Sequence, residues 1–421
     1  MLVDAWLPRA AAVGPHTLAV NNLSYGQLLL AAQRAARQLS ALGVAAGDRV
    51  ALVLEPGEDF VVAFHAVLLL GAVAVPIDVN ASPSQLEART AGARTVVDGP
   101  LEGHEDPAAI LSTQHPLGAP AVVIFSSGSS GDGNEIELSY GNFWWSAAGS
   151  AVALGRSEHE RWLCCLPVAH IGGLSIIVRS AIYATTAVVH QRFDLEAVLA
   201  ELERSDGPSL ISLVPTTLQR LLDAGLKAPP SLRWALLGGG PISPELLEQA
   251  NEASVPVASS YGMTEACSQI VTRGAPLFCT TVELADSGEV LVSGPTVAAQ
   301  CLPQLHTGDL ARWTDAAELQ LIGRASNIII SGGENVVPEV VEAAIATHPA
   351  VGDVAVVGRA DPEWGEIVTA LVVLRPGEKV DVEELIEHCK PLLAPHERPK
   401  RIDLVESISR SETGKLRRRE L

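Results

Sequence analysis

Stretches with apolar residues at helical spacing alternate with short, continuously apolar stretches along most of the chain. Residues 24–43 keep apolar side chains three and four positions apart, start at Ser24, which can cap a helix, and stop at Gly43. The next segment, DRVALVLE at 48–55, is apolar almost without a break and predicts a buried strand. The same alternation recurs at 193–215 and 231–262. Strands of this kind separated by helices are typical of parallel sheets with helices on both faces, so the sequence predicts an α/β fold.

The pattern changes to shorter segments after about residue 323. We expect a strand, a helix, two strands, a helix and a basic tail, at 326–332, 337–349, 351–359, 367–374, 381–394 and beyond. The sequence therefore predicts two domains. The first is a large N-terminal domain at 1–323, with parallel or mixed sheets flanked by helices, and the second is a small α+β C-terminal domain at 324–421.

One stretch could be mistaken for a membrane span. Residues 60–77, FVVAFHAVLLLGAVAVPI, contain a histidine, a glycine and a proline, and Gly71 divides them into a helix-length and a strand-length piece. We expect a buried helix followed by a buried strand. The N-terminus has an acidic residue early and no basic region before an apolar one, so no signal peptide is predicted.

Length and charge limit the function classes. A chain of 421 residues with 48% apolar residues is long enough for two or more domains with large cores. The formal net charge is -20, spread along the chain, which argues against nucleic acid or an anionic membrane as partner. An anionic ligand must then be held by local donors or a metal. The six cysteines show no C-x-x-C spacing, which favours reduced, buried thiols and a cytoplasmic protein.

A Ser- and Gly-rich segment at 126–131 follows the apolar strand AVVIF, where a strand end can present a turn to a nucleotide. Glycines let backbone N–H groups turn inward, and serines add donors for phosphate. Its flank, however, carries Asp132, Glu135 and Glu137 and no cation. An ordinary turn is the alternative.

Three further segments carry candidate chemistry, each with a simpler alternative. In SSYGMTEACSQ at 259–269, Tyr261 could stack on a base, Thr264 could donate to phosphate and Glu265 could hold Mg²⁺, or the segment could be a capped helix start. In HTGDLARW at 306–313, Asp309 is expected in a turn before a strand, where it could accept from ribose hydroxyls. Lys415 lies on a Gly-flanked loop near the end, where a lysine is ordinarily just solvated.

Together the segments are more specific than any one of them. S-S-G-S-S-G at 126–131, Y-G-M-T-E at 261–265, T-G-D at 307–309, G-R-x-x-N-x-I-x-x-G-G-E-N at 323–335 and T-G-K at 413–415 occur in that order. In this order and spacing the chain resembles the acyl-adenylate-forming, AMP-binding superfamily, which includes acyl-CoA and aryl-CoA synthetases, adenylation domains of peptide synthetases and luciferase. Within it, the segments at 162–180, 213–222, 236–243 and 261–272 are most similar to the o-succinylbenzoate:CoA ligases of menaquinone biosynthesis.

The resemblance implies an AMP-forming acid–thiol ligase that uses ATP, Mg²⁺ and coenzyme A. Lys415, Thr264 and Glu265 match the catalytic residues, and Glu265 is also the expected Mg²⁺ ligand. The nucleotide would be held by Ser126, Ser127, Gly128, Ser129, Ser130, Gly131, Gly239, Gly240, Tyr261, Gly262, Met263, Asp309 and Arg324. The acyl substrate would be held by His170, Arg179, Gly238 and Ser268. For His170, a satisfied core histidine is the alternative.

The chain departs from the family pattern at two positions. The phosphate loop usually continues Gly-x-Pro-Lys-Gly, and Asn134 stands where that lysine would meet the β- and γ-phosphates. Asn327 stands where the hinge residue is usually acidic or a lysine; the small domain is expected to rotate about a hinge near 324–327 between the two reaction steps. We therefore predict a working ligase with weak ATP use.

The identity of the substrate depends on fewer residues than the type of reaction. o-Succinylbenzoate carries two carboxylates, so its site needs a cation besides Lys415, and Arg179 in an apolar run is the candidate. An ion pair with a structural carboxylate is the alternative for Arg179. Another aryl or acyl acid, or a nucleotide-binding homologue with weakened catalysis, stays open as a function. A homodimer is also left open.

Overall fold

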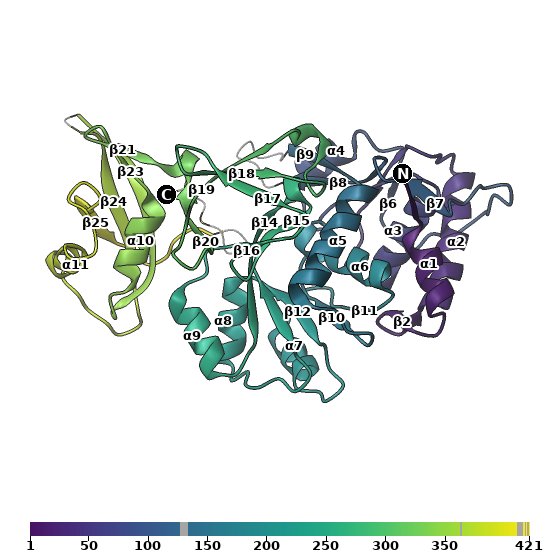
Figure 1. Ribbon diagram of the computed structural model, residues 1–421, viewed down its shortest axis with the longest axis horizontal. Helices are drawn as coiled ribbons and strands as arrows, with labels where there is room; N and C mark the ends of the chain where they lie inside the picture. The colour runs from purple at the N-terminus through teal and green to yellow at the C-terminus, as the bar shows by residue number, and fades with distance from the viewer. Residues whose placement is uncertain (127–133, 363, 411–415, 417, 419–420) are drawn as a thin grey trace. The chain divides into compact units, whose positions relative to one another are not determined.

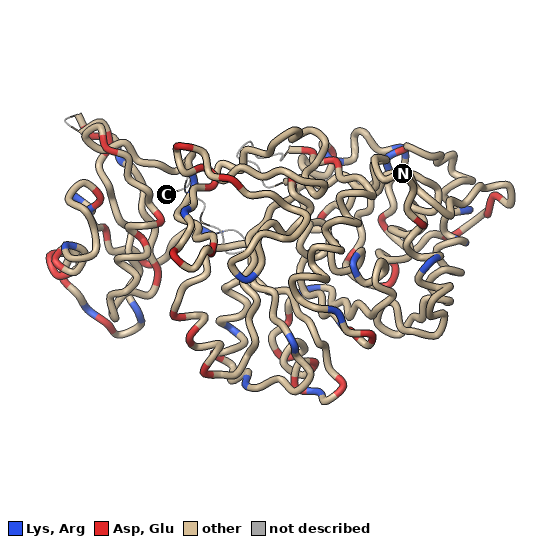
Figure 2. Tube along the Cα trace, viewed as in Figure 1, with Lys and Arg blue, Asp and Glu red and all other residues tan. Residues whose placement is uncertain are grey.

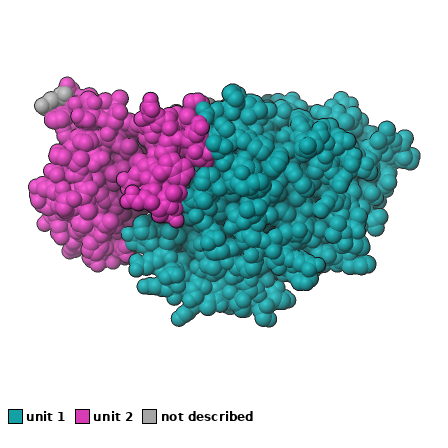
Figure 3. All heavy atoms as spheres, in the orientation of Figure 1, with its two compact units in different colours: residues 1–281, 292–305 teal, residues 282–291, 306–421 magenta. Residues whose placement is uncertain are grey.

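The computed structural model describes residues 1–126, 134–362, 364–410, 416, 418 and 421. The chain divides into two compact units, coloured separately in Figure 3. Unit 1 comprises residues 1–281 and 292–305, and unit 2 comprises residues 282–291 and 306–421. The boundary predicted at 323 falls inside unit 2, within the strand Leu319–Arg324 and one residue before its end. That the chain has a hinge near 324–327 stays a prediction.

The larger sheet of unit 1 has the order β16-β15-β14-β13-β12-β10-β11-β2-β3 (Figure 1). Its strands from β14 to β2 are parallel to one another, and antiparallel strands complete each edge. In sequence order they are β2 Leu18–Val20, β3 Leu23–Ser24, β10 Arg161–Cys164, β11 Thr186–Val189, β12 Leu210–Leu213, β13 Trp234–Leu237, β14 Val257–Met263, β15 Ser268–Thr272 and β16 Ala275–Pro276.

A second sheet of unit 1 has the order β6-β4-β5-β8-β9, and a short antiparallel pair joins β1 to β7. The strands are β1 Leu2–Asp4, β4 Arg49–Leu52, β5 Val73–Pro76, β6 Thr95–Val97, β7 Gln114–Pro116, β8 Pro120–Ser126 and β9 Asn134–Ser139. Helices of unit 1 are α1 Trp6–Val13, α2 Tyr25–Ala41, α3 Glu58–Leu69, α4 Pro83–Thr90, α5 Tyr140–Leu154, α6 Ile171–Tyr183, α7 Leu195–Leu202, α8 Pro215–Asp223 and α9 Pro244–Glu252, with 3₁₀ turns at Thr264–Ala266 and Ala299–Cys301.

Neighbouring residues of the central strands point into two different cores. In β10, Trp162 and Cys164 pack with helices α1, α2, α3, α5 and α6, whereas Leu163 packs with α7, α8 and α9. Successive side chains of a strand lie on opposite faces, so a sheet covered on both faces needs apolar residues at every position. The continuous apolar runs of the sequence follow from this requirement, and the predicted α/β fold is confirmed.

The predicted helix that starts at Ser24 and the predicted helix and strand at 60–77 are also confirmed. Ser24 caps α2 through a reciprocal pair with Gln27, in which the Gln27 N–H donates to the Ser24 hydroxyl and the Ser24 N–H donates to the Gln27 side chain. The apolar stretch at 60–77 forms the buried helix α3 and the buried strand β5, with Gly71 at φ +70° between them. No described helix is both long enough and apolar enough to cross a membrane.

Unit 2 contains two sheets. The first has the order β17-β18-β19-β20, from Thr281–Leu284, Glu289–Ser293, Leu305–Trp313 and Leu319–Arg324, so β17 and β18 extend across the boundary of the units. The second has the order β22-β21-β24-β23, with β25 beside β24, from β21 Ile329–Ser331, β22 Glu334–Val336, β23 Val351–Asp361, β24 Gly365–Leu374 and β25 Arg401–Leu404. Helices α10 Pro338–Ala346 and α11 Val382–Cys389 and a 3₁₀ turn at Ala325–Asn327 complete it.

The core beside the second sheet contains side chains from both helices. Val341 and Ile345 of α10 and Leu385 of α11 are fully buried with strand residues such as Val356 and Val368. Acidic residues occur along the trace of both units, as Figure 2 shows, so the net charge of -20 is not confined to one of them.

Candidate functional site

The carboxyl ends of the parallel strands β13 and β14 bring the candidates that follow these two strands together. Strands β13 and β14 pair with Leu237 opposite Ser259, so Gly238 lies beside Ser260 just beyond β13. A Cβ atom at 238 would lie 2.7 Å from the Ser260 carbonyl oxygen, and Gly239 has φ +80°. The glycines are therefore required by close backbone approach and by backbone conformation, and they leave an edge with no side chains where a flat ligand can approach.

A sharp turn follows β14. A register shift between Tyr261 and Gly262 makes a β-bulge, and a Cβ at 262 would lie 1.7 Å from the Ser268 carbonyl oxygen, which excludes any side chain there. The Cys267 N–H donates to the Thr264 carbonyl, and Ser268, at φ +94°, pairs with Met263. The segment expected as a nucleotide contact or a helix start is thus a strand followed by one 3₁₀ turn.

Glu265 occupies the middle of that turn. Its carbonyl accepts from the Ala298 N–H, and among the described residues no hydrogen bond or ion pair joins its carboxylate to another side chain. No described group of three His, Cys, Asp or Glu residues could hold a metal ion. A single free carboxylate nevertheless fits Mg²⁺, because this ion keeps waters and substrate phosphates as most of its ligands.

The acidic flank of the Ser- and Gly-rich segment is partly neutralised. Residues 127–133, which include Ser127, Gly128, Ser129, Ser130 and Gly131, lie outside the described residues. At the two ends of the segment, Ser126 pairs with Asn134 across β8 and β9, and Arg49 Nη1 lies 2.8 Å from Glu135 Oε2. This exposed ion pair adds little stability, but it neutralises the negative charge of Glu135 next to the loop.

His170 is exposed at the residue before α6 and is not a core histidine. Its carbonyl accepts from the N–H groups of Gly173 and Leu174, which fixes the start of the helix. A Cβ at 173 would lie 2.4 Å from the Pro167 carbonyl oxygen, so Gly173 is required by the tight entry into α6. The alternative of a satisfied core histidine is therefore wrong, and the acyl-site role stays a prediction.

Arg179 lies two turns further along α6 and is only 2% exposed. Its Nη2 donates to the Ser146 hydroxyl at 3.0 Å, its guanidinium carbon lies 5.6 Å from the centre of the Trp162 ring, and its Nε has no hydrogen-bond partner in the described residues. Burial lowers the pKa of Arg179. No described carboxylate pairs with it, so the structural ion pair considered as the alternative is not found among those residues.

The Arg179 contact leads directly to the turn after β14. The Ser146 hydroxyl donates to the Cys267 carbonyl at 2.7 Å, so Arg179, Ser146 and the Thr264–Ser268 turn are joined by hydrogen bonds. Ser146 was not predicted from the sequence. It lies within the apolar helix α5, and the only signal is a hydroxyl at a position that helical spacing assigns to the core.

Unit 2 carries the ribose candidates. Asp309 pairs with Arg324 across β19 and β20, and Arg324 Nε lies 2.7 Å from Asp309 Oδ1. Asp309 is buried and lies inside β19, so its expected position in a turn is wrong. Because Arg324 holds one carboxylate oxygen, the orientation of the side chain is fixed before any ribose arrives.

Asn327, the hinge candidate, is one of the described residues, and the candidate catalytic lysine is not. Asn327 ends the 3₁₀ turn after β20, and its side-chain N–H donates to Glu339 Oε1 at 2.8 Å. Lys415 lies outside the described residues, so its role stays an expectation.

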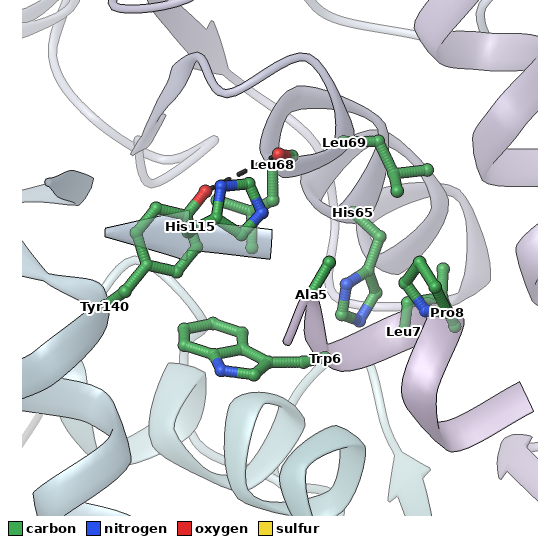
Figure 4. A pocket seen from close by; sticks show the side chains of 9 residues that line it. All are labelled: Ala5, Trp6, Leu7, Pro8, His65, Leu68, Leu69, His115 and Tyr140. Atoms are coloured by element: carbon green, nitrogen blue, oxygen red, sulfur yellow. Dashed lines mark hydrogen bonds between the residues drawn. The ribbon is translucent and has the colours of Figure 1, made fainter. Parts of the chain in front are cut away.

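A small cavity in unit 1 is lined by other residues. Trp6, His65, His115 and Tyr140 surround it together with aliphatic side chains (Figure 4). Its volume of about 10 Å³ admits one water molecule at most. The cavity is therefore not a substrate site.

Comparison with known proteins identifies the family. The AMP-binding enzyme model matches residues 7–114 and 105–302, and the AMP-binding enzyme C-terminal domain model matches residues 340–415. The chain belongs to the AMP-binding enzyme family. The predicted resemblance to acyl-adenylate-forming enzymes is thereby confirmed.

Particular relatives match over their whole length. The chain is 33% identical to the 2-succinylbenzoate–CoA ligase of Bacillus subtilis, over 99% of this chain and 97% of that protein, and 34% identical to the ligase of the same name from Bacillus licheniformis, over the full length of both. Among solved structures, o-succinylbenzoate CoA synthetase of Bacillus subtilis in complex with its acyl-adenylate intermediate matches with a TM-score of 0.91 at 32% identity, over 100% of this chain and 98% of that one. The same enzyme with ATP and magnesium ion matches with a TM-score of 0.89 at 31% identity, over 100% of both.

Proposed function

We propose that the protein is an ATP-dependent ligase that joins 2-succinylbenzoate to coenzyme A through an acyl-adenylate, a step of menaquinone biosynthesis. The full-length identity to ligases of that name supports this, as does the strand-end arrangement of Gly238, Tyr261, Thr264 and Glu265. The substrate carboxylate attacks the α-phosphate of ATP and pyrophosphate leaves. The sulfur of coenzyme A then attacks the acyl carbonyl and AMP leaves.

The chain needs no nucleophile for either step, so its residues act by alignment and by stabilising charge. Thr264 donates to the phosphates, Glu265 holds Mg²⁺, and Asp309, oriented by Arg324, accepts from the ribose hydroxyls. Mg²⁺ neutralises part of the triphosphate charge when it is bound. Lys415 supplies a cation for the charge that develops between the carboxylate and the α-phosphate. Residues 324–421 rotate about the hinge near 324–327 between the two steps, and this rotation takes Lys415 out of the site.

The buried Arg179 is the observation that favours a substrate with two carboxylates. A buried guanidinium without an anionic partner is costly, and the described residues offer it only a hydroxyl and the face of Trp162. The carboxylate of 2-succinylbenzoate that is not activated supplies the missing charge. A monocarboxylic aryl acid would not supply an anionic partner for the Arg179 guanidinium.

The test is pyrophosphate release with ATP and Mg²⁺ over a panel of 2-succinylbenzoate, benzoate and medium-chain fatty acids, with and without coenzyme A. We expect release that depends on 2-succinylbenzoate, yields its thioester and disappears in Lys415→Ala. In Arg179→Met the KM for the diacid should rise about tenfold or more while the KM for ATP changes little, because one charged contact is lost. The exposed Arg192→Met is the matched control.

Other outcomes assign other functions. Equal release with benzoate, unaffected by Arg179→Met, would identify a different aryl acid as substrate. ATP binding without release for any acid would favour a nucleotide-binding homologue with weakened catalysis. We also infer a cytoplasmic location, which cell fractionation would test, and light scattering would decide whether the chain forms a homodimer.

A further inference from the structure

The side chain of Glu339 joins two parts of unit 2 that are far apart in sequence. Asn327, at the candidate hinge, donates to Glu339 Oε1 at 2.8 Å, and Arg418 Nη2 donates to the same oxygen at 3.0 Å. The Glu339 side chain is about 20% exposed and the Arg418 side chain about 18%. The hinge turn and the C-terminal segment therefore meet on one partly buried carboxylate oxygen.

Space around Glu339 is limited. A Cβ built on Gly323, in β20, would lie 2.4 Å from Glu339 Oε2, and this oxygen is buried without a hydrogen-bond partner among the described residues. The carboxylate therefore packs against the backbone that enters the hinge. It has no freedom to swing toward β20 if the contact at Asn327 is lost.

The chemistry of this contact requires a hydrogen-bond donor at position 327. An amide N–H can donate to a carboxylate, whereas an ionised aspartate is only an acceptor. An aspartate in place of Asn327 would put a second carboxylate at hydrogen-bond distance from Glu339 in a half-buried site, where like charges cannot both remain ionised at low cost. Asn327 is one of the two residues that depart from the family pattern, and Glu339 supplies a reason for that departure.

Arg418, the second partner of Glu339, lies close in sequence to segment 411–415, which contains Lys415. Arg418 also donates to both oxygens of Glu342, at 2.7 Å and 3.0 Å, which fixes it to α10. Before the segment, Arg410 Nη2 donates to Asp353 Oδ1 at 2.6 Å, and Arg410 pairs with Leu416 in an antiparallel bridge. The described residues on both sides of 411–415 are thus held by arginine–carboxylate pairs to β23 and α10.

We infer that Glu339 is a positioning residue that holds the hinge amide of Asn327 and the C-terminal Arg418 on one carboxylate, and that Asn327 and Glu339 form a matched pair. The pair links the hinge conformation to the segment in which Lys415 lies. This rests on the proposed function, because it assigns Lys415 to adenylate formation and residues 324–327 to the hinge. Restoring an acid at position 327 is therefore expected to harm this chain.

The experiment uses the full chain with Asn327→Asp, Glu339→Gln and the two together. Asn327→Asp should lower the rate of pyrophosphate release about tenfold, with thioester formation from supplied acyl-adenylate affected less, since Lys415 serves only the first step. In the double variant, the new amide at position 339 can donate to the new carboxylate at position 327, and its oxygen can still accept from Arg418. The rate should then return to within about threefold of Glu339→Gln alone, as expected for side chains that interact directly.

Thermal unfolding of the same variants tests the pair without catalysis. The midpoint should fall in Asn327→Asp and recover in the double variant. Asn251→Asp on α9 and Glu383→Gln on α11 are the controls, because both side chains are exposed and neither has a side-chain partner in the described part of the chain. Both should leave rate and midpoint unchanged.

Three outcomes are decisive. Asn327→Asp with wild-type or higher rate and midpoint would overturn the inference, and so would a double variant no better than Asn327→Asp. No pyrophosphate release by the wild type would overturn the proposed function alone, because the recovery of the midpoint in the double variant would still establish the pair.

Discussion

Charged side chains of the candidate site differ in whether the chain itself supplies their partners. Asp309 is held by Arg324, and Glu135 is held by Arg49. The carboxylate of Glu265 and the guanidinium of Arg179 have no oppositely charged partner among the described residues. The charges of Asp309 and Glu135 are therefore balanced within the chain, whereas the charges of Glu265 and Arg179 have to be balanced by a ligand or metal.

Asn134 leads to a prediction at this scale. Asn134 is exposed at the start of β9, opposite Ser126, so a longer side chain there meets no packing. Asn134→Lys should raise kcat/KM for ATP about ten- to a hundredfold, because a charge-assisted contact to phosphate contributes about 1.5–3 kcal/mol. Steady-state kinetics at varied ATP measures this, with the exposed Asn251→Lys as control. An unchanged value would mean that the loop does not govern ATP use.

At the scale of elements, helix α6 carries the acyl-site candidate Arg179, begins directly after His170, and is anchored from another helix. The Tyr25 hydroxyl of α2 lies 2.8 Å from the Ser180 carbonyl oxygen and 2.6 Å from the Thr185 carbonyl oxygen. The Ser180 carbonyl lies in the last turn of α6 and also accepts from the Thr185 N–H, whereas the Thr185 carbonyl lies two residues beyond the end of the helix. Tyr25 thereby holds the end of the helix on which Arg179 lies.

Removing this hydroxyl should destabilise the protein. Tyr25→Phe removes a buried donor and leaves the Thr185 carbonyl without the hydroxyl from which it accepts, so the free energy of unfolding should fall by about 1–3 kcal/mol in urea titrations. Tyr140→Phe is the matched control, because the Tyr140 hydroxyl lies at the limiting distance of 3.5 Å from the Leu68 carbonyl oxygen and should contribute less. Equal losses in the two variants would contradict the anchoring role.

Elements with strong periodicity were predictable, and contacts between elements were not. Helix α2 has a capping box and a glycine stop within its own sequence, and the apolar run at 60–77 contains its own break at Gly71. The position of Asp309 inside β19 depends instead on its partner strand β20, and no local signal marks such pairing. The same limit applies to Ser146 and Glu339. Arg179, a partner of Ser146, lies 33 residues away in sequence, and Asn327, a partner of Glu339, lies 12 residues away, so only the folded chain brings each pair together.

At the scale of the whole molecule, buried histidines predict sensitivity to acid. Burial lowers the pKa of His65 and of His115 from 6.5 to about 4. Between pH 6.5 and 4 the unfolded chain therefore binds more protons than the folded one. Stability should be complete above pH 6.5, fall as the pH decreases through this window and stop changing for these groups below about 4. The largest loss is about 3 kcal/mol for each histidine.

Urea unfolding at pH 7.5, 6.5, 5.5 and 5 tests this expectation, with pH values chosen to lie mostly above carboxylate titration, near pH 4. His65→Leu, which cannot take up a proton, should flatten the dependence between pH 6.5 and 5. The exposed His159→Gln should leave it unchanged. A wild-type stability that stays constant over this range would show that the cavity of Figure 4 admits charged histidine.

The division of the chain was only partly visible in the sequence. The change of pattern near residue 323 marks the second sheet of unit 2, whose strands and helices are short. The strands β17 and β18 carry ordinary alternating patterns, so nothing in their sequence assigns residues 282–291 to unit 2. That assignment follows from pairing with β19, which is a property of the folded sheet.

The return of the chain to unit 1 at 292–305 has a consequence for biosynthesis. During translation, β17 and β18 leave the ribosome as a hairpin, and the strands that complete their sheet, β19 and β20, follow only after a segment that belongs to unit 1. The outer edge of β18 is unpaired during this interval and is open to pairing with another nascent chain. Slow decoding in the interval after β18 has left the ribosome and before β19 has left it would lengthen that exposure, so synonymous codon choice in the part of the message read during this interval should affect the yield of folded protein.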